Sequence, residues 1–177
     1  MENSKIKYKL KKSQKVKRLR ISIHSDASVV VSAPFSMSQK TIEKFMREKS
    51  SWIKKSIDYY ENKAIRLESF ELTRGKREEI KEYITTRLEE INKVYNFDYN
   101  KVFIKNHKSR WGSCSSDRNL NFNYRIISLP QRLSDYIITH ELCHISEMNH
   151  SRRFWDQVSR NIPDHLERRR ELKKIIF

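Results

Sequence analysis

The sequence predicts an α+β fold, with a small N-terminal antiparallel β-sheet, two long helices and a mixed C-terminal unit. Apolar residues alternate with polar ones over residues 6–33, and from residue 36 to 98 they recur at every third or fourth position. The last third of the chain combines both periods. A length of 177 residues fits a single domain. We therefore expect one domain, residues 1–177, with parts 1–35, 36–98 and 99–177.

The first part is predicted to be β-rich and basic. Residues 6–10 alternate between apolar side chains and lysine, which is typical of a strand with one buried and one solvated face. A second alternating run covers residues 19–23 and a third covers residues 29–33. Ser25 and Asp26 between these runs favour a turn, so we expect a hairpin.

The middle part carries two helical stripes. The first runs from residue 42 to 57, with Ser36 or Ser38 as the N-cap. Gly75 interrupts the pattern, and a second stripe extends from residue 80 to about Asn96. We expect one long helix for each stripe.

The last part begins with a short strand at residues 102–104 and a second strand at residues 120–124. Pro130 then precedes a helix that spans residues 133–145. Shorter helices are predicted around residues 154–158 and 166–176. The strands, the connection between them and the helix after Pro130 form the mixed unit.

The composition indicates a thin core within a heavily charged surface, because 37% of the residues are hydrophobic and 34% are charged. The net charge is +16, and residues 1–20, with nine Lys or Arg and one Glu, supply half of it. Such a concentration in one segment makes nucleic acid a possible partner of the N-terminal part. A solvated strand face is the alternative.

Three features predict a cytoplasmic location. The longest apolar runs have three or four residues, too few for a transmembrane helix, so no membrane partner is expected. The first residues contain no apolar segment of the kind found in secretion signals. Cys114 and Cys143 are the two cysteines, which is too few for a disulfide framework.

Residues 140–144 read His-Glu-Leu-Cys-His, the H-E-x-x-H pattern. Residues four apart on a helix lie about 40° from each other, so His140 and His144 can bind one ion. Two neutral imidazoles suit Zn²⁺, and we expect one zinc per chain. Glu141 is placed to hold a metal-bound water and to take its proton as general base.

A third ligand is expected at His150, ten residues after His140, provided that the helix ends near Glu147 and the chain folds back. Asn149 could supply a left-handed residue for this turn. Other candidates remain open at this point. They are Glu147, Asp164, His165 and Glu167.

Several motifs follow one another in a characteristic order: Arg110–Ser115 (RWGSCS), Asn119–Asn123 (NLNFN), Leu129-Pro130, His140–His144 (HELCH) and Asn149–Trp155 (NHSRRFW). This series resembles the YgjP-like metallopeptidase family, whose members are predicted metal-dependent hydrolases related to SprT-like and minigluzincin zincins. The resemblance is strong over residues 100–170. It implies a zincin-like catalytic unit at residues 99–177, with zinc on His140, His144 and His150 and with Glu141 as general base.

In zincins, the strand that precedes the active-site helix binds an extended substrate by β-addition. Residues 112–124 are placed to form that edge, which makes Gly112, Ser113, Asn123 and Tyr124 candidate substrate-binding residues. Gly112 is one of only two glycines, so its position needs a positive φ or a close backbone approach. Asn123, Tyr124, His107 and Arg110 remain alternatives for stabilising the oxyanion.

The predicted function is that of a zinc-dependent metallopeptidase, in which metal-bound water activated by Glu141 attacks a peptide carbonyl of a protein or peptide substrate. The alternative is a nucleic-acid-associated, SprT-like protease or a DNA-binding protein that uses the basic N-terminal segment. A structural zinc module is disfavoured, because a closed site has no need of the neighbouring carboxylate.

Overall fold

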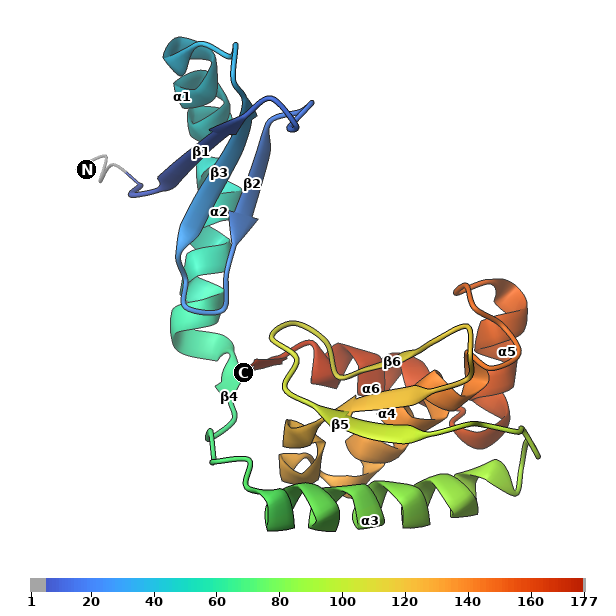
Figure 1. The fold of residues 1–177 in the computed structure, drawn as a ribbon. Coiled ribbons are helices and arrows are strands. Elements are labelled where there is room, and N and C mark those ends of the chain that lie inside the picture. The colour runs from blue at the N-terminus through green and yellow to red at the C-terminus, as the bar shows by residue number, and fades with distance from the viewer. Residues whose placement is uncertain (1–5, 177) are drawn as a thin grey trace. The chain divides into compact units, whose positions relative to one another are not determined.

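The computed structural model describes residues 6–176, which pack into two compact units (Figure 1). The N-terminal unit contains the described residues up to Ile65 together with Ile176, and the C-terminal unit contains Arg66–Ile175. Each has its own hydrophobic core. The two-residue strands β4 (Ile65–Arg66) and β8 (Ile175–Ile176) lie at the boundary of this division. A single functional domain over residues 1–177 stays a prediction.

The N-terminal unit contains a three-stranded sheet in the order β1-β3-β2. Its strands are β1 (Lys9–Ser13), β2 (Arg20–Ile23) and β3 (Val29–Pro34). The predicted hairpin is confirmed, since β2 and β3 pair antiparallel. β1, however, pairs parallel with β3, so the sheet is mixed and not antiparallel throughout. Alternation identifies strands but does not reveal which strand lies in the middle.

Two helices and a π-helical turn complete this unit: α1 (Gln39–Glu48), α2 (Ser50–Asp58) and η1 (Tyr59–Lys63). Ser38 is the N-cap of α1, as predicted, and its hydroxyl accepts a hydrogen bond from the Thr41 N–H. The single long helix expected here was wrong. The backbone of Lys49 leaves the helical region, with φ −95° and ψ 4°, and divides the segment into two helices.

The sheet of the C-terminal unit has the order β5-β7-β6. β5 (Val102–Lys105) runs parallel to β7 (Leu120–Asn123), and β6 (Gly112–Cys114) runs antiparallel to β7. The two strands predicted in this region are confirmed. β6 has one neighbour in the sheet, so its outer edge is unpaired by any other strand of the described chain.

Five helical segments pack around this sheet: α3 (Arg74–Asn92), the 3₁₀ segment η2 (Tyr124–Ser128), α4 (Gln131–Cys143), α5 (Arg152–Asn161) and α6 (His165–Leu172). The prediction that Gly75 interrupts the helical pattern was wrong. It lies in the first turn of α3, where Thr73 is the N-cap and accepts from the Lys76 N–H. The α+β fold class is confirmed.

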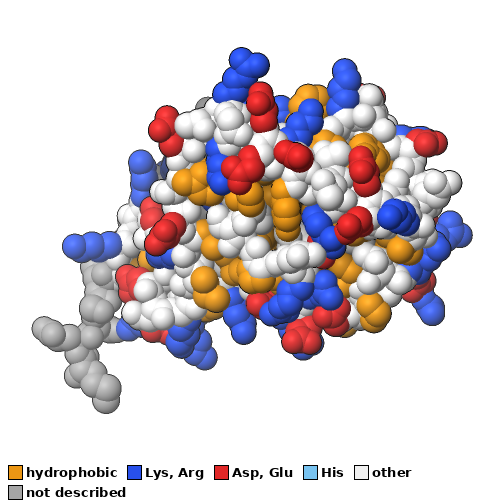
Figure 2. Space-filling view, turned by 90° about the horizontal axis from the view of Figure 1, so that it is seen from below, with side chains coloured by type: hydrophobic (Ala, Val, Ile, Leu, Met, Phe, Trp, Pro, Cys, Tyr) orange, Lys and Arg blue, Asp and Glu red, His pale blue; other side chains and the backbone are white. Residues whose placement is uncertain are grey.

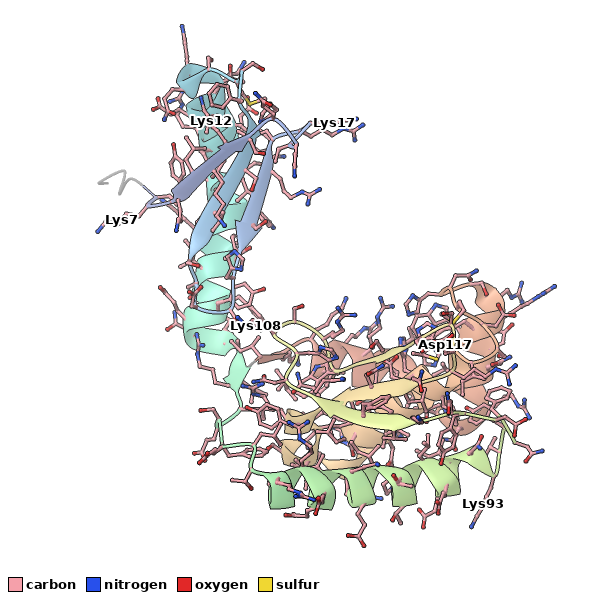
Figure 3. All side chains as sticks on the ribbon, in the orientation of Figure 1. Lys7, Lys12, Lys17, Lys93, Lys108 and Asp117 are labelled. Carbon is pink, nitrogen blue, oxygen red and sulfur yellow. The ribbon has the colours of Figure 1, made fainter. Side chains whose placement is uncertain are left out.

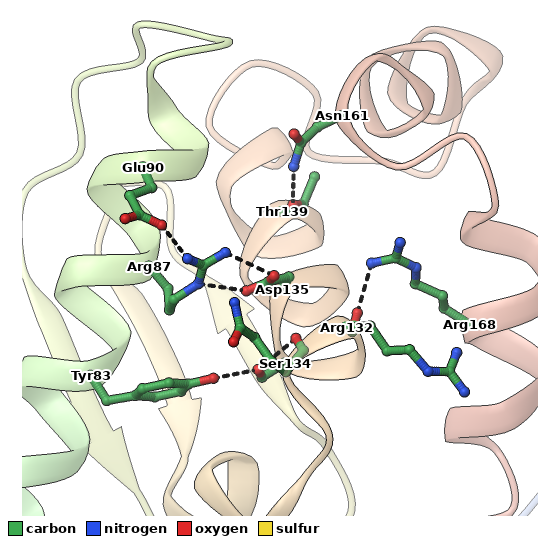
Figure 4. A network of polar contacts seen from close by, with 10 residues as sticks. Tyr83, Arg87, Glu90, Arg132, Ser134, Asp135, Thr139, Asn161 and Arg168 are labelled. Atoms are coloured by element: carbon green, nitrogen blue, oxygen red, sulfur yellow. Dashed lines mark hydrogen bonds and ion pairs between the residues drawn. The ribbon is translucent and has the colours of Figure 1, made fainter.

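Polar contacts fix the position of α4 relative to the neighbouring helices (Figure 4). Arg87 of α3 donates two hydrogen bonds of 2.9 Å to the carboxylate of Asp135 in α4. Tyr83 and Ser134 share a hydrogen bond of 2.7 Å one turn away. Bidentate arginine–carboxylate pairs are geometrically specific, so these contacts fix the helix that carries residues 140–143.

In the part of the chain that the structure describes, no helix is both long enough and apolar enough to cross a membrane.

Candidate metal centre

Three imidazoles converge at the C-terminal end of α4. One nitrogen from each of His140, His144 and His150 lies within 4.8 Å of the others. The Nε2 atoms of His140 and His150 are 3.0 Å apart. Among the described residues, no other group of histidine, cysteine or acidic side chains converges in this way.

The local backbone explains how residues ten apart come together. α4 ends at Cys143, with His144 as its C-cap, so the helix stops about one turn earlier than the predicted end near Glu147. The predicted left-handed residue at Asn149 was wrong, because the positive-φ residues of the described chain lie elsewhere. The Asn149 side-chain oxygen instead accepts from the Ser151 N–H, a local turn that needs no positive φ.

Phe154 forms the apolar support of the three imidazoles. Ser151 is the N-cap of α5 and accepts from the Phe154 N–H, which places this residue in the first turn of the helix. The Phe154 ring is fully buried, and its centroid lies 4.5–4.9 Å from those of all three histidines. The sequence gives one weak signal for this role, since Phe154 follows His150 by a helical step of four residues.

Burial favours the neutral form of two of the imidazoles, those of His140 and His144. Burial, followed by the charges of His144, His150 and Arg169, lowers the pKa of His140 to about 3. Burial also lowers the pKa of His144. The Nδ1 atom of His144 lies 2.9 Å from the Glu147 carbonyl oxygen, to which it donates, so Nε2 is left with a free lone pair.

Glu141 lies beside this cluster and is 6% exposed. Burial raises the pKa of Glu141 to about 8, and the positive charge of Arg110 acts in the opposite direction. Its Oε2 atom is buried and has no hydrogen-bond partner in the described structure. Buried polar atoms are nearly always hydrogen-bonded, so an unpartnered carboxylate oxygen here is available to a molecule that enters the site.

Gly112 of β6 packs directly against Glu141. A Cβ atom at this position would lie 2.6 Å from Glu141 Cγ and 2.7 Å from Oε1. The φ of Gly112 is not positive. Of the two reasons predicted for this glycine, the structure therefore supports the close backbone approach.

A family model that describes the YgjP-like metallopeptidase domain matches residues 17–76 and 71–175. The chain belongs to this family. The resemblance inferred from the motifs at residues 110–155 is confirmed. Among curated proteins, no match was found.

Solved structures with detectable similarity include two metallopeptidase zymogens. One is Pyrococcus abyssi abylysin, with 21% identity over 50% of this chain and 90% of that chain, and a TM-score of 0.47. The other is Methanocaldococcus jannaschii jannalysin, with 26% identity over 53% of this chain and 91% of that chain, and a TM-score of 0.41.

The residues that this YgjP-like chain presents fit a zinc ion. Tetrahedral Zn²⁺ with ligands at 2.0–2.1 Å requires nitrogen atoms about 3.3 Å apart, close to the spacing of the His140 and His150 nitrogens. Neutral imidazoles are the protonation state that metal binding needs. The second nitrogen of His144 already has the carbonyl partner that commonly orients a zinc ligand.

The other candidates for a third ligand have different partners. The Asp164 carboxylate pairs with Arg168 at 2.9 Å. His165 stacks on Trp155 and its Nδ1 lies 3.3 Å from the Ser159 hydroxyl. Glu147 contributes its backbone carbonyl, and Glu167 is an exposed residue of α6. None of them belongs to the described histidine cluster.

The predicted substrate-binding residues divide into two groups. Gly112 and Ser113 lie in β6, the edge strand. Asn123 and Tyr124 are buried: the Asn123 amide donates to the carbonyls of His107 and Arg110, and the Tyr124 ring packs edge-on against Phe70. The hydrogen bonds of Asn123 hold the loop before β6. A role of Asn123 and Tyr124 in substrate binding stays a prediction.

Proposed function

We propose that this protein is a zinc-dependent peptidase that binds one Zn²⁺ per chain through His140, His144 and His150. Glu141 serves as the general base. The observation that carries the proposal is the convergence of three imidazoles next to a buried carboxylate with an unpartnered oxygen.

When bound, Zn²⁺ would act as a Lewis acid towards the scissile carbonyl and lower the pKa of a water to about 7. The charge of the ion would lower the raised pKa of Glu141. The carboxylate then accepts the proton of the attacking water through its unpartnered oxygen and returns it to the leaving amine. Gly112 and the surrounding strand hold this carboxylate in place and keep bulk water away from it. Phe154 keeps the three imidazoles in their common orientation.

The unpaired edge of β6 supports binding of an extended protein or peptide substrate. Added strands pair through main-chain hydrogen bonds, which Gly112 can supply because its main-chain groups face away from β7. Arg110 precedes this strand and is exposed, and its charge acts on Glu141. Two of the four candidates for the oxyanion group, Asn123 and Tyr124, are buried and used by the fold, which leaves Arg110 and His107.

The test pairs zinc content with turnover on the same preparation. Glu141→Gln keeps the shape of the side chain but cannot accept a proton at neutral pH. We expect it to retain one zinc per chain while hydrolysis of unfolded casein falls by roughly 10²–10⁴, the usual effect of a positioned general base. Glu147→Gln is the matched control, since the described contacts of this residue are made by its backbone and not by its side chain. It should keep both zinc and activity.

Two outcomes would contradict this assignment. Loss of zinc together with activity in Glu141→Gln would make Glu141 a ligand or a structural group. Full activity with zinc retained would mean that hydrolysis does not use this carboxylate. Removal of the metal by a chelator should abolish turnover in the parent, and added Zn²⁺ should restore it.

A second candidate function, nucleic-acid binding, has a specific observation in its favour. In the N-terminal sheet, apolar residues such as Leu10 and Val31 face the core, while Lys9, Lys11 and Arg20 are exposed. Lys11 and Arg20 flank Ser32 in one row across the sheet. Figure 3 also shows Lys7 and Lys17 extending from this unit.

This row of bases differs from the surface in Figure 2, where acidic and basic side chains intermingle. We expect binding to DNA to weaken with salt, with a slope of about −0.9 per neutralised phosphate. Deletion of residues 1–20 would remove β1 from the sheet, so substitution to Gln is the better test. The test triple is Lys9, Lys11 and Arg20, and the matched control triple is Lys93, Lys101 and Lys108. Equal salt slopes for the two triples would refute this function.

A further inference from the structure

The three consecutive arginines of α6 have different surroundings. Arg168 donates to the Asp164 carboxylate at 2.9 Å and to the Arg132 carbonyl at 2.8 Å. The guanidinium of Arg169 lies 5.1 Å from the ring centroid of Trp155. Arg170 is exposed. In the sequence, the three arginines are typical of one solvated helix face. In the structure, only Arg169 of the three contacts Trp155, which packs against the histidine cluster.

Trp155 connects Arg169 with the histidine cluster. Its ring stacks on that of His150, with centroids 5.6 Å apart and an interplanar angle of 24°, and lies 5.8 Å from the His140 ring. The guanidinium is thus at most about 11 Å from His140, a distance that an extended peptide covers in about three residues at ~3.3 Å each. The Arg169 charge also contributes to the lowered pKa of His140, and it opposes the burial that raises the pKa of Tyr136.

Arg169 forms no ion pair among the described residues. Within residues 6–176, no carboxylate lies within ion-pair distance of it. Two acids near it pair with other arginines, Asp164 with Arg168 and Glu171 with Arg132. The third, Glu167, is exposed and forms no ion pair in the described structure. Like charges repel, so a bound dication would not be stabilised by this arginine. The cation is exposed, restrained by an aromatic ring and available to an anion.

We propose that Arg169 binds a carboxylate of the substrate, within about three residues of the cleaved bond. The proposal rests on the peptidase function argued above and adds a preference for acidic substrates to it. A guanidinium matches a carboxylate with two parallel hydrogen bonds, which lysine or a neutral side chain cannot reproduce. The carboxylate can belong to an acidic side chain or to the free C-terminus of a peptide.

The experiment compares peptides that differ in one carboxylate. One set carries Glu or Gln at each of the three positions on either side of the cleaved bond, with both ends blocked. A second set contains the Gln peptide with a free or an amidated C-terminus at each of these distances. At one position, we expect kcat/KM to be about 10-fold higher for the peptide with the additional carboxylate than for its neutral partner. This difference appears in the first set if Arg169 binds a side-chain carboxylate, and in the second set if it binds a C-terminal carboxylate. The preference should weaken with added salt.

Arg169→Gln should abolish this preference, and Arg170→Gln, which removes the same charge one residue further along α6, should keep it. The ratio of acidic to neutral turnover is measured within each variant, so that changes in folding or zinc content cancel. Equal turnover of acidic and neutral peptides by the parent would overturn the proposal. So would a preference that survives in Arg169→Gln.

A binding experiment separates this proposal from the peptidase function. Zinc-loaded Glu141→Gln protein is titrated with the same peptides, and affinity is measured by calorimetry. If the parent cleaves no peptide, the proposed function fails, but the Arg169 proposal is still decided by this titration. Tighter binding of the acidic peptides that depends on Arg169 and not on Arg170 supports it, and equal affinity overturns it.

Discussion

Replacing Gly112 by alanine tests how closely the position of Glu141 is controlled. The added Cβ would lie 2.6 Å from Glu141 Cγ and 2.8 Å from Cδ, where ordinary contact requires 3.4–4 Å. The carboxylate must therefore move by about 1 Å, and a displacement of that size in a catalytic group costs roughly 10²-fold in rate. We expect Gly112→Ala to lose about two orders of magnitude in kcat/KM on an unfolded protein substrate. The three imidazoles keep their contacts with Phe154, so zinc content should stay at one per chain.

The chain provides its own control for this substitution. A Cβ atom on Gly75, the other glycine, would meet nothing within 4 Å, and the residue lies in the first turn of α3. Gly75→Ala should leave kcat/KM unchanged and stabilise the protein by up to about 1 kcal/mol, the usual difference between glycine and alanine in a helix. Activity would be measured by peptide fluorescence, zinc by elemental analysis and stability by chemical denaturation. Parent-like turnover in Gly112→Ala would refute the link between this glycine and the general base.

Three further predictions address the ligand set and the framework that holds it. His150→Ala should weaken zinc binding by orders of magnitude in a chelator competition, while Glu167→Ala keeps one zinc per chain; the reverse result would move the third ligand to α6. Phe154→Ala should lower the free energy of unfolding by about 3–5 kcal/mol and speed the loss of zinc to a chelator, because it opens a cavity under all three imidazoles. Asp135→Asn removes the charged partner of Arg87 between α3 and α4 and should cost about 1–3 kcal/mol in denaturant unfolding, with zinc stoichiometry unchanged. A protein as stable as the parent would show that this pair does not hold the helix.

The elements whose residue pattern is local and periodic could be predicted from the sequence. The alternation at residues 19–33 and the four-residue step between His140 and His144 are local patterns, and each has the structure that its period implies. The strand order could not be predicted, because the insertion of β3 between β1 and β2 depends on contacts between segments and not on the pattern within any one of them. The break at Lys49 was missed for a related reason: the apolar stripe continues across it, and only the backbone angles change.

In the candidate site, too, some features could be predicted from the sequence and others could not. The spacing of His150 predicted a fold-back after α4, and the structure brings this residue to His140 and His144. The predicted left-handed backbone at Asn149 was wrong, since the turn instead contains a hydrogen bond that the Asn149 side chain accepts from the Ser151 N–H. The support from Phe154 was missed, because an aromatic residue at a helix start is usually part of the core, and here it is also the surface on which the imidazoles rest.

The use of glycine in this chain shows why Gly112 belongs to the site. Left-handed backbone positions normally favour glycine, yet in the described chain Ala27, Asn96 and Arg118 occupy them. Turns here therefore form without glycine, at a modest cost in backbone strain. Gly112 has no positive φ and is explained by space alone, because only a residue without a Cβ leaves room for the Glu141 side chain. The identity of this residue is thus determined by the carboxylate it packs against, which ties the edge strand β6 to the chemistry proposed for α4.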